Sequence, residues 1–238
     1  MNDLRRYFQE NTGGTIDKWD HYFDIYERHF ARFRQTDVHI LEIGVFQGGS
    51  LKMWKDYFGP QAQIYGIDIN PHCQVFAEDQ IQILIGDQSD RGFLRSIKQQ
   101  IPRIDILIDD GGHRMDQQIS TFQELFGQIS AKGVYLCEDT HTSYWRAWGG
   151  GVRRRGSFVE YTKQMIDWLN AWHSRQPRKL SVTDFTQSVN SLHFYDSVVV
   201  IEKSPRAEPT HRRTGAPIVP EYEEPKGRFW RRFLKEYR

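Results

Sequence analysis

The stretch VHILEIGVFQGGS, residues 38–50, joins a short apolar run to a glycine-rich turn, and it decides the fold. Residues 38–44 are apolar almost without interruption, which is typical of parallel strands that helices cover on both faces. Gly44 and Gly48 then frame a turn into a segment with helical spacing. A strand, a tight turn and a helix are the first parts of a βαβ unit.

Further apolar runs follow at intervals, with helical patterns between them. They are QIYGIDI (63–69), IQILIGD (81–87), IDILIDD (104–110) and GVYLCED (133–139). Residues 180–185 and 191–203 predict two more strands, the second with a hairpin or bend at Tyr195-Asp196. We expect helices over residues 19–33, 49–58, 89–99, 115–129 and 158–172. This alternation predicts an α/β fold with a doubly wound, seven-stranded, mostly parallel sheet and a C-terminal hairpin.

The composition excludes several classes of protein. Of the 238 residues, 26% are charged and 14% aromatic, which fits a globular chain and not a disordered one. Lys and Arg total 32 and Asp and Glu total 31, so the bulk charge does not favour a nucleic-acid partner. No apolar run is long enough for a membrane span, and the N-terminus has no apolar signal segment. Cys73 and Cys137 lie in or beside apolar stretches and predict buried free thiols, hence a reducing, cytoplasmic location.

Ligands of a doubly wound sheet bind beyond the carboxyl ends of its strands, so the residues that close each apolar run are candidates. Glu42, Gly44 and Gly48 close the first run. Their spacing differs from a dinucleotide fingerprint, which would need a glycine where Phe46 stands. Asp68 closes the second run, and a carboxylate there can accept hydrogen bonds from both hydroxyls of a ribose.

The third and fourth runs also end in polar residues. Asp87 and Gln88 can meet the edge of an adenine, and Asp109 joins them as a cofactor-binding candidate. The order and spacing of these run ends resemble the class I S-adenosylmethionine-dependent methyltransferases, whose first motif is an acidic residue, one further residue and Gly-x-x-x-Gly. The resemblance implies S-adenosylmethionine as cofactor, with Glu42 near its ammonium group through water and Asp68 on its ribose.

Carboxylates and a histidine follow the fourth and fifth runs. Adjacent parallel strands would bring Asp110 together with Glu138 and Asp139 at one edge of the sheet. Such a cluster is unfavourable unless a cation binds, and oxygen ligands suit magnesium, manganese or calcium. Two glycines before His113 allow its imidazole to turn back over the site. The alternative is that Asp109 and Asp110 cap the next helix and that His113 is a surface residue.

At these residues the sequence resembles the metal-dependent sugar O-methyltransferases of macrolide and related antibiotic pathways. The motif IDDGGH followed by ED carries the resemblance, and three other stretches extend it: GTIDKWDHYFDIYERHF (14–30), THTSYWRAWGGG (140–151) and SLHFYDSVVVIEK (191–203). Macrolide enzymes of this kind carry an additional N-terminal domain, and we expect the enzyme described by this sequence to differ from them in that part. The resemblance implies magnesium at Asp110, Glu138 and Asp139. It also implies that His113 is the general base and that the acceptor is a hydroxyl of a sugar or glycoside.

Two other functions remain open on the sequence alone. A catechol-type or other small-molecule O-methyltransferase would use the same metal chemistry on an aromatic diol. A non-catalytic S-adenosylmethionine-binding module would keep the sheet without turnover. The aromatic loop at 144–148 fits either a lid over a sugar or a packed surface loop. The sequence does not decide whether a polar group before the predicted first helix gates the cofactor: Asp17, Lys18, Asp20 and His21.

The chain divides into three predicted parts. We expect residues 1–36 to form an N-terminal helical cap, 37–203 the methyltransferase domain, and 204–238 an extended arm with a basic amphipathic tail helix. The tail is expected to dock on its own core or on a neighbouring subunit. We also expect a homo-oligomer. Contact of the tail with an anionic membrane is the less favoured alternative.

Overall fold

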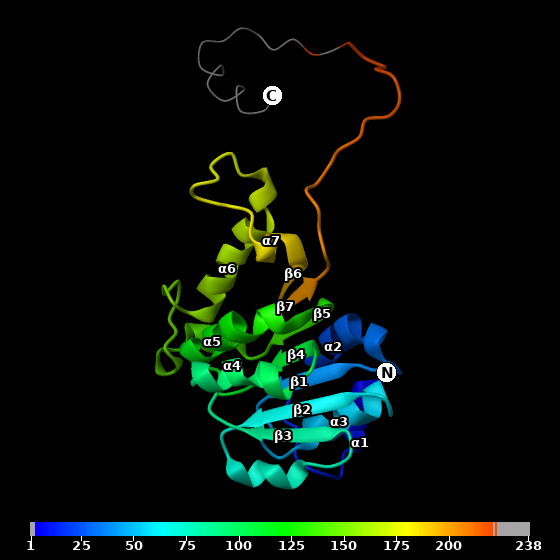
Figure 1. Cartoon of the computed structure of the whole chain (residues 1–238), viewed down its shortest axis with the longest axis vertical. Helices are drawn as coiled ribbons and strands as arrows, with labels where there is room; N and C mark the ends of the chain where they lie inside the picture. Colours follow the sequence, from blue (N-terminus) through cyan, green and yellow to red (C-terminus); the bar gives the residue numbers. More distant parts are fainter. Residues whose placement is uncertain (1–2, 221, 223–238) are drawn as a thin grey trace. The chain divides into compact units, whose positions relative to one another are not determined.

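A computed structural model of the protein describes residues 3–220 and 222 (Figure 1). Within them, a seven-stranded sheet has the order β3-β2-β1-β4-β5-β7-β6. β1 to β5 pair in parallel, and β7 is antiparallel to both β5 and β6. The predicted doubly wound sheet with a C-terminal hairpin is therefore confirmed. The strands are β1 (His39–Ile43), β2 (Gln63–Asp68), β3 (Ile81–Ile85), β4 (Ile104–Asp109), β5 (Ile129–Cys137), β6 (Val189–Tyr195) and β7 (Val198–Lys203).

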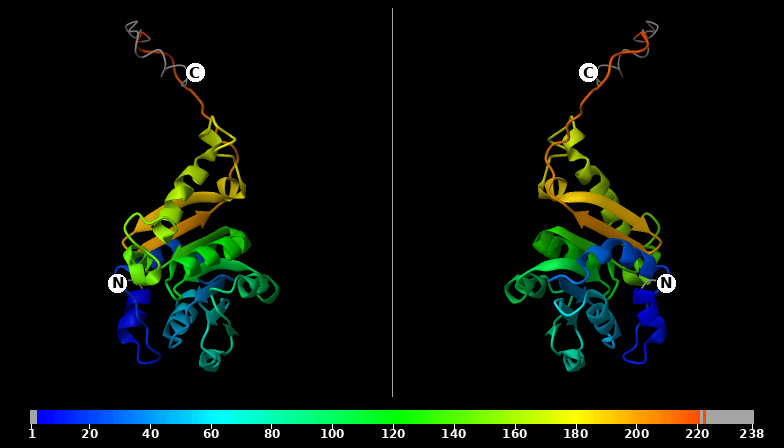
Figure 2. Two further views of the ribbon diagram at one scale, coloured as in Figure 1. Left: turned by 90° about the vertical axis from the view of Figure 1, so that its left-hand side faces the viewer. Right: turned by 90° about the vertical axis from the view of Figure 1, so that its right-hand side faces the viewer.

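The central strands carry apolar residues on both faces because helices cover both faces of the sheet (Figure 2). Along β1, Ile40 belongs to one buried cluster and Leu41 to the other, and Ile106 and Leu107 repeat this alternation in β4. One face carries α1 (Asp3–Glu10), α2 (Tyr22–Phe30) and α3 (Gly49–Phe58). The other face carries α4 (Arg91–Gln100), α5 (Met115–Leu125), α6 (Phe158–Leu169) and α7 (Asp184–Ser188). With both faces covered, the carboxyl ends of the strands are the part of the sheet left for a ligand.

Short 3-10 helices extend or connect these elements. They are η1 (Ala31–Phe33), η2 (Pro71–Phe76), η3 (Phe126–Gln128), η4 (Thr140–Tyr144), η5 (Arg146–Trp148) and η6 (Ala171–His173). η1, η3 and η6 follow α2, α5 and α6, so each of those helices is shorter than its sequence pattern predicts.

The strand predicted over residues 180–185 is wrong, because α7 begins at Asp184. The Thr183 amide donates to the Thr186 hydroxyl over 3.1 Å, and the Gln187 amide donates to the Thr183 carbonyl. Side-chain hydrogen bonds of this kind begin a helix and oppose extension of the chain. The sequence pattern also does not predict α1, a short helix of which only Leu4 is fully buried.

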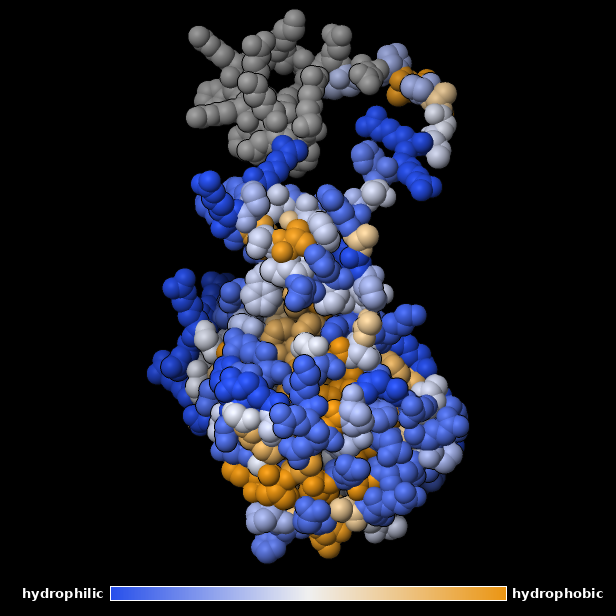
Figure 3. Space-filling view, in the orientation of Figure 1, coloured by the Kyte–Doolittle hydropathy of each residue, from blue (hydrophilic) through white to orange (hydrophobic). Residues whose placement is uncertain are grey.

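Two compact units divide the chain, Met1–Ala207 and Glu208–Arg238. In the second, residues 208–220 and 222 form no helix or strand, and the predicted tail helix over 226–238 lies outside the described residues. Among the residues described, no helix is both long and apolar enough to cross a membrane. Cys73 and Cys137 are buried free thiols, as predicted. The face in Figure 3 is largely polar, with apolar side chains gathered near β3.

Candidate active site

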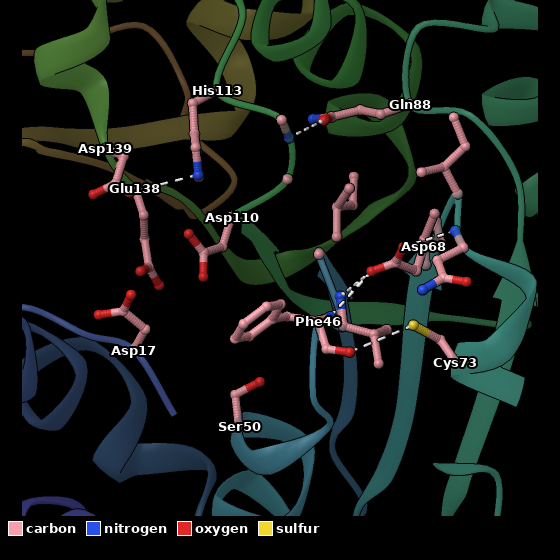
Figure 4. A pocket seen from close by; sticks show the side chains of 18 of the residues that line it. Asp17, Phe46, Ser50, Asp68, Cys73, Gln88, Asp110, His113, Glu138 and Asp139 are labelled. Atoms are coloured by element: carbon pink, nitrogen blue, oxygen red, sulfur yellow. Dashed lines mark hydrogen bonds and ion pairs between the residues drawn. The ribbon is translucent and has the colours of Figure 1, made fainter. Parts of the chain in front are cut away.

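A cavity of about 620 Å³ lies at the carboxyl ends of the parallel strands (Figure 4). The segments that follow β1 to β5 form most of its wall, and residues 15–19 with Tyr22 form another part. Glu42, Gly48 and Asp109 are predicted site residues that do not line it. The predicted site residues that line it are Gly44, Asp68, Asp87, Gln88, Asp110, His113, Glu138 and Asp139.

Asp68 holds the turn between β1 and α3. Its Oδ2 atom accepts hydrogen bonds from the amides of Val45 and Phe46, over 2.9 and 3.0 Å. Its Oδ1 atom accepts from the amide of Asn70 over 2.8 Å. Each carboxylate oxygen has further lone pairs, so both can still accept from a ligand hydroxyl.

The two predicted glycines of this turn have left-handed backbone conformations. φ is +98° at Gly44 and +70° at Gly48. A Cβ atom on Gly44 would collide with the carbonyl oxygen of Asp110, and one on Gly48 would collide with the ring of Phe76. Glycine is therefore required twice over at both positions, by backbone angle and by space.

Glu42 lies beneath the turn and is fully buried. Its Oε2 atom accepts a hydrogen bond from the Ser50 hydroxyl over 2.8 Å, while Oε1 has no hydrogen-bond partner in the described structure. Burial raises the pKa of Glu42 to about 7, and the Lys18 ammonium, 3.8 Å from Oε1, opposes that rise. Ser50 lines the cavity, so Glu42 is connected to the cavity through its hydrogen bond with the Ser50 hydroxyl.

Gln88 is buried at the cavity wall and its amide is already engaged. Nε2 donates to Asp109 over 2.6 Å and to Thr121 over 2.9 Å, and Oε1 accepts from the Gly112 amide over 3.1 Å. Asp109 itself is buried behind Gln88, where loss of water raises its pKa to about 6. The cofactor-binding role of Asp109 stays a prediction: its carboxylate contacts Gln88, and Asp109 does not line the cavity.

His113 and Asp139 lie close together on one side of the cavity, with their side chains facing one another (Figure 4). Nε2 of His113 lies 3.5 Å from Oδ2 of Asp139. Both residues have left-handed backbone conformations, with φ of +54° and +52°. The Thr142 hydroxyl lies 2.8 Å from the His113 carbonyl oxygen and 2.9 Å from that of Asp139, which fixes the two turns to each other.

Glu138 points to the same region but has other partners. Its Oε1 atom accepts from the Tyr26 hydroxyl over 2.7 Å, and its Oε2 atom accepts from the Lys18 ammonium over 2.9 Å. Burial, followed by repulsion from Asp110, raises the pKa of Glu138 to about 8, although the lysine lowers it.

Lys18 is the cation among these carboxylates. Its side chain is 2% exposed, and its ammonium contacts Asp110 as well as Glu138. Burial alone would lower the pKa of Lys18, but Asp110, Glu138 and Glu42 together hold it well above the ordinary value. The role that the sequence left undecided for Lys18 is therefore an electrostatic one within the site.

Tyr22 and Tyr26 are functional candidates that the sequence reasoning missed. The Tyr22 hydroxyl donates to Oδ1 of Asp139 over 2.7 Å, and the Tyr26 hydroxyl donates to Glu138. A signal for them exists, because residues 22 and 26 are spaced by four along α2, and such spacing places side chains on one face of a helix.

Asp110, His113 and Asp139 form a group that can hold a metal ion. One ligand atom from each lies within 4.8 Å of the others. Two hard carboxylate donors at the edge of a negatively charged cluster fit a hard divalent cation. Glu138, predicted as the third carboxylate ligand, lies outside this group because Lys18 and Tyr26 hold it.

Aromatic rings line up beside Asp139. The ring centroids of Trp19 and His141 are 5.9 Å apart, those of His141 and Trp145 4.6 Å, and those of Trp145 and Trp148 5.2 Å. Trp19 lines the cavity and is 57% exposed, and Trp145 is 47% exposed. The predicted aromatic loop thus packs against the N-terminal segment while keeping ring surface accessible.

Comparison with known sequences finds relatives over most of this chain, although no family model matches. The chain is 36% identical over 218 residues to the 8-demethyl-8-(2-methoxy-alpha-L-rhamnosyl)-tetracenomycin-C 3'-O-methyltransferase of Streptomyces olivaceus, covering 87% of this chain and 55% of that protein. It is 35% identical over 188 residues to the mycinamicin VI 2''-O-methyltransferase of Micromonospora griseorubida, covering 75% and 47%. The chain thus spans about half the length of the curated relatives it matches.

Solved structures agree on the fold. The MycE methyltransferase from the mycinamycin biosynthetic pathway, in complex with Mg and SAH, has a TM-score of 0.78 and 31% identity, covering 86% of this chain and 55% of that chain. A second complex of that enzyme, with Mg, SAH and mycinamycin VI, has a TM-score of 0.77.

Proposed function

We propose that this chain, which is homologous to the sugar O-methyltransferases of antibiotic pathways, is a class I methyltransferase that transfers a methyl group from S-adenosylmethionine to a hydroxyl of a sugar or glycoside. One observation carries the proposal. The glycine turn with Asp68 and the group of Asp110, His113 and Asp139 open into a single cavity. A donor and an acceptor bound there would lie in one cavity.

The methyl donor would bind on the side of the β1–α3 turn. Gly44 has no side chain, so the backbone can approach the methionine part of the donor closely. Asp68 lines the wall and would accept from the ribose hydroxyls. Glu42 would act on the donor ammonium through Ser50 or water, because it does not line the cavity itself.

A hard divalent cation would be held by Asp110 and Asp139, with Glu138 beside them. The carboxylate chemistry of this group supports magnesium, as does the relative whose structure contains Mg. When bound, such an ion acidifies and positions a hydroxyl that coordinates it.

His113 would take the proton of the acceptor hydroxyl. Its Nδ1 atom is buried and has no hydrogen-bond partner in the described part of the chain, so Nε2 is the nitrogen available for the transfer. Asp139, 3.5 Å from Nε2, would stabilise the imidazolium that forms. The hydroxyl oxygen bonds to the methyl carbon while the carbon–sulfur bond breaks and its electron pair stays on sulfur.

The proposal also covers the domain organisation, the cellular compartment and the assembly of the enzyme. Residues 37–203 would form the methyltransferase domain, 1–36 its N-terminal cap and 204–238 an arm. The cap contributes Lys18 and Trp19 to the site, which supports a role in substrate enclosure. Buried free thiols fit a reducing compartment such as the cytoplasm, and a homo-oligomer would give the arm a partner surface.

A panel of acceptors tests the proposal. The full chain is incubated with methyl-labelled S-adenosylmethionine and MgCl₂ together with rhamnosides, other glycosides or catechol, and products are measured by mass spectrometry. Label in a glycoside, lost in His113→Ala, is the expected result. Label in catechol alone would assign a small-molecule O-methyltransferase. Calorimetric donor binding with no transfer to any acceptor would indicate a binding module.

A further inference from the structure

The ammonium of Lys18 occupies the centre of the acidic cluster. It contacts Asp110 and lies 2.9 Å from Oε2 of Glu138, and it is 3.8 Å from Oε1 of Glu42. The lysine side chain is 2% exposed, so water contributes little to neutralising these carboxylates. The Lys18 ammonium therefore supplies a positive charge at the place where the proposed function requires a metal ion.

The contacts of Lys18 overlap those that a metal ion would need. Asp110 is shared between the lysine and the group that can hold a divalent cation. Glu138, the carboxylate next to Asp139, is turned toward the lysine and Tyr26. A second cation within contact distance of the same oxygens would be repelled by the ammonium, and the buried setting would strengthen that repulsion.

Lys18 belongs to a connecting segment, which is not held in the sheet or in a helix. Residues 11–21, between α1 and α2, contain no helix or strand. Residues 15–19 of the segment also form part of the cavity wall. A change in the position of Lys18 would therefore change the shape of the cavity.

We propose that Lys18 is an internal cation that holds the acidic cluster together in the metal-free protein and that a divalent cation must displace. Loading of the metal would then release the Lys18 ammonium from Asp110 and Glu138 and shift the segment that carries it. The inference rests on the proposed metal dependence, but it concerns the affinity for the metal and not turnover.

Calorimetric titration with MgCl₂ alone, at about pH 8.5 to keep the carboxyl groups ionised, tests the proposal on the full chain. Lys18→Met removes the ammonium and keeps most of the side-chain length. This variant should bind Mg²⁺ about tenfold more tightly than the parent, or better, because the competing charge is gone. Lys18→Arg keeps the charge and should retain the weaker affinity. Lys52→Met is the matched control, since Lys52 pairs with Glu78 on the surface of α3.

Each other outcome overturns the inference. If Lys18→Met bound Mg²⁺ more weakly than the parent, the lysine would support the metal site. If its affinity for Mg²⁺ were unchanged, the lysine would have no effect on metal binding. Equal tightening by Lys18→Arg would mean that shape, and not charge, sets the affinity. If neither the parent nor Lys18→Met binds Mg²⁺, the inference fails together with the metal part of the proposed function. If both bind equally, only the inference fails.

A measurement on the unaltered protein covers the case in which Lys18→Met does not fold. Amide hydrogen exchange of residues 11–21 is followed with and without MgCl₂. Displacement of Lys18 should speed exchange in this segment when Mg²⁺ is added. Slower or unchanged exchange there would contradict displacement.

Discussion

Nε2 of His113 lies 3.5 Å from Oδ2 of Asp139, although 25 intervening residues separate the two in the chain. Both stand just beyond neighbouring parallel strands, β4 and β5, in left-handed backbone conformations that turn their side chains toward one cavity. The pair combines a group that can accept a proton with a carboxylate that can stabilise the resulting charge, and this combination leads to the first prediction.

Replacing His113 by Ala should lower kcat by about 10²–10⁴-fold, the usual contribution of a general base. Donor affinity should stay the same, because the turn with Gly44 and Asp68 is untouched. Steady-state kinetics and calorimetry with S-adenosylmethionine measure the two quantities. His173→Ala, in η6 and outside the cavity wall, is the matched control. A kcat within a few-fold of the parent would remove His113 from the reaction.

Stripping divalent cations with a chelator should abolish methyl transfer, and added MgCl₂ should restore it. The physical reason is the negative charge that Asp110 and Asp139 bring to the acceptor hydroxyl, which opposes its deprotonation unless a cation is present. Initial rates before and after dialysis against chelator give the answer. Undiminished turnover in the chelated protein would contradict metal dependence.

Gly44→Ala should destabilise the fold by about 1–3 kcal/mol or more, because φ is +98° and the new Cβ would meet the Asp110 carbonyl. Urea unfolding followed by circular dichroism measures the free energy of unfolding. Gly127→Ala is the comparison, since a Cβ there meets nothing within 4 Å. Equal stability of the two variants would mean that the β1–α3 turn can rearrange.

Tyr26→Phe should lower the free energy of unfolding by about 1–3 kcal/mol, because Glu138 loses a hydrogen-bond donor in a buried place. The exposed Tyr222→Phe provides the control, with no expected change. In a double-mutant cycle, adding Glu138→Met, which removes the acceptor and keeps a similar length, should remove most of the Tyr26→Phe effect. Fully additive changes would separate the two residues energetically.

Glu42 should make stability depend on pH. Its pKa is about 7 in the folded protein and about 4.3 when unfolded, so the folded state binds more protons between these values. The stabilisation is complete below the unfolded pKa and is lost as pH rises through 7. Glu42→Gln cannot ionise, so its stability should gain on the parent between about pH 5 and pH 8. Urea unfolding at both pH values checks this, and parallel pH profiles would argue against it.

The sequence predicts the sheet well and its short helices poorly, for physical reasons. Ile40 and Leu41 enter opposite cores, so β1 carries apolar residues on both of its faces, and such a run is easy to see. α7 depends on hydrogen bonds around Thr183, and propensity alone favours a strand there. A helix such as α1 leaves a weak pattern because it buries little.

The site is predicted where residues follow strands and missed where they come from elsewhere. Asp110, His113 and Asp139 meet because parallel strands end at one edge, which topology alone requires. Lys18 and Tyr26 contact Glu138 from the N-terminal part of the chain, more than 100 residues away. No local sequence pattern predicts such a contact. The orientation of Glu138 follows from them, so it could not be predicted either.

The three backbone amides that donate to Asp68 fix its carboxylate in the folded protein. When a ribose binds here, the Asp68 oxygens that accept from it are already in position. Little side-chain entropy would therefore be lost on binding. Discrimination between nucleosides could then rest on the shape of a rigid surface, and variants that loosen the 45–46 turn should bind the donor less selectively as well as more weakly.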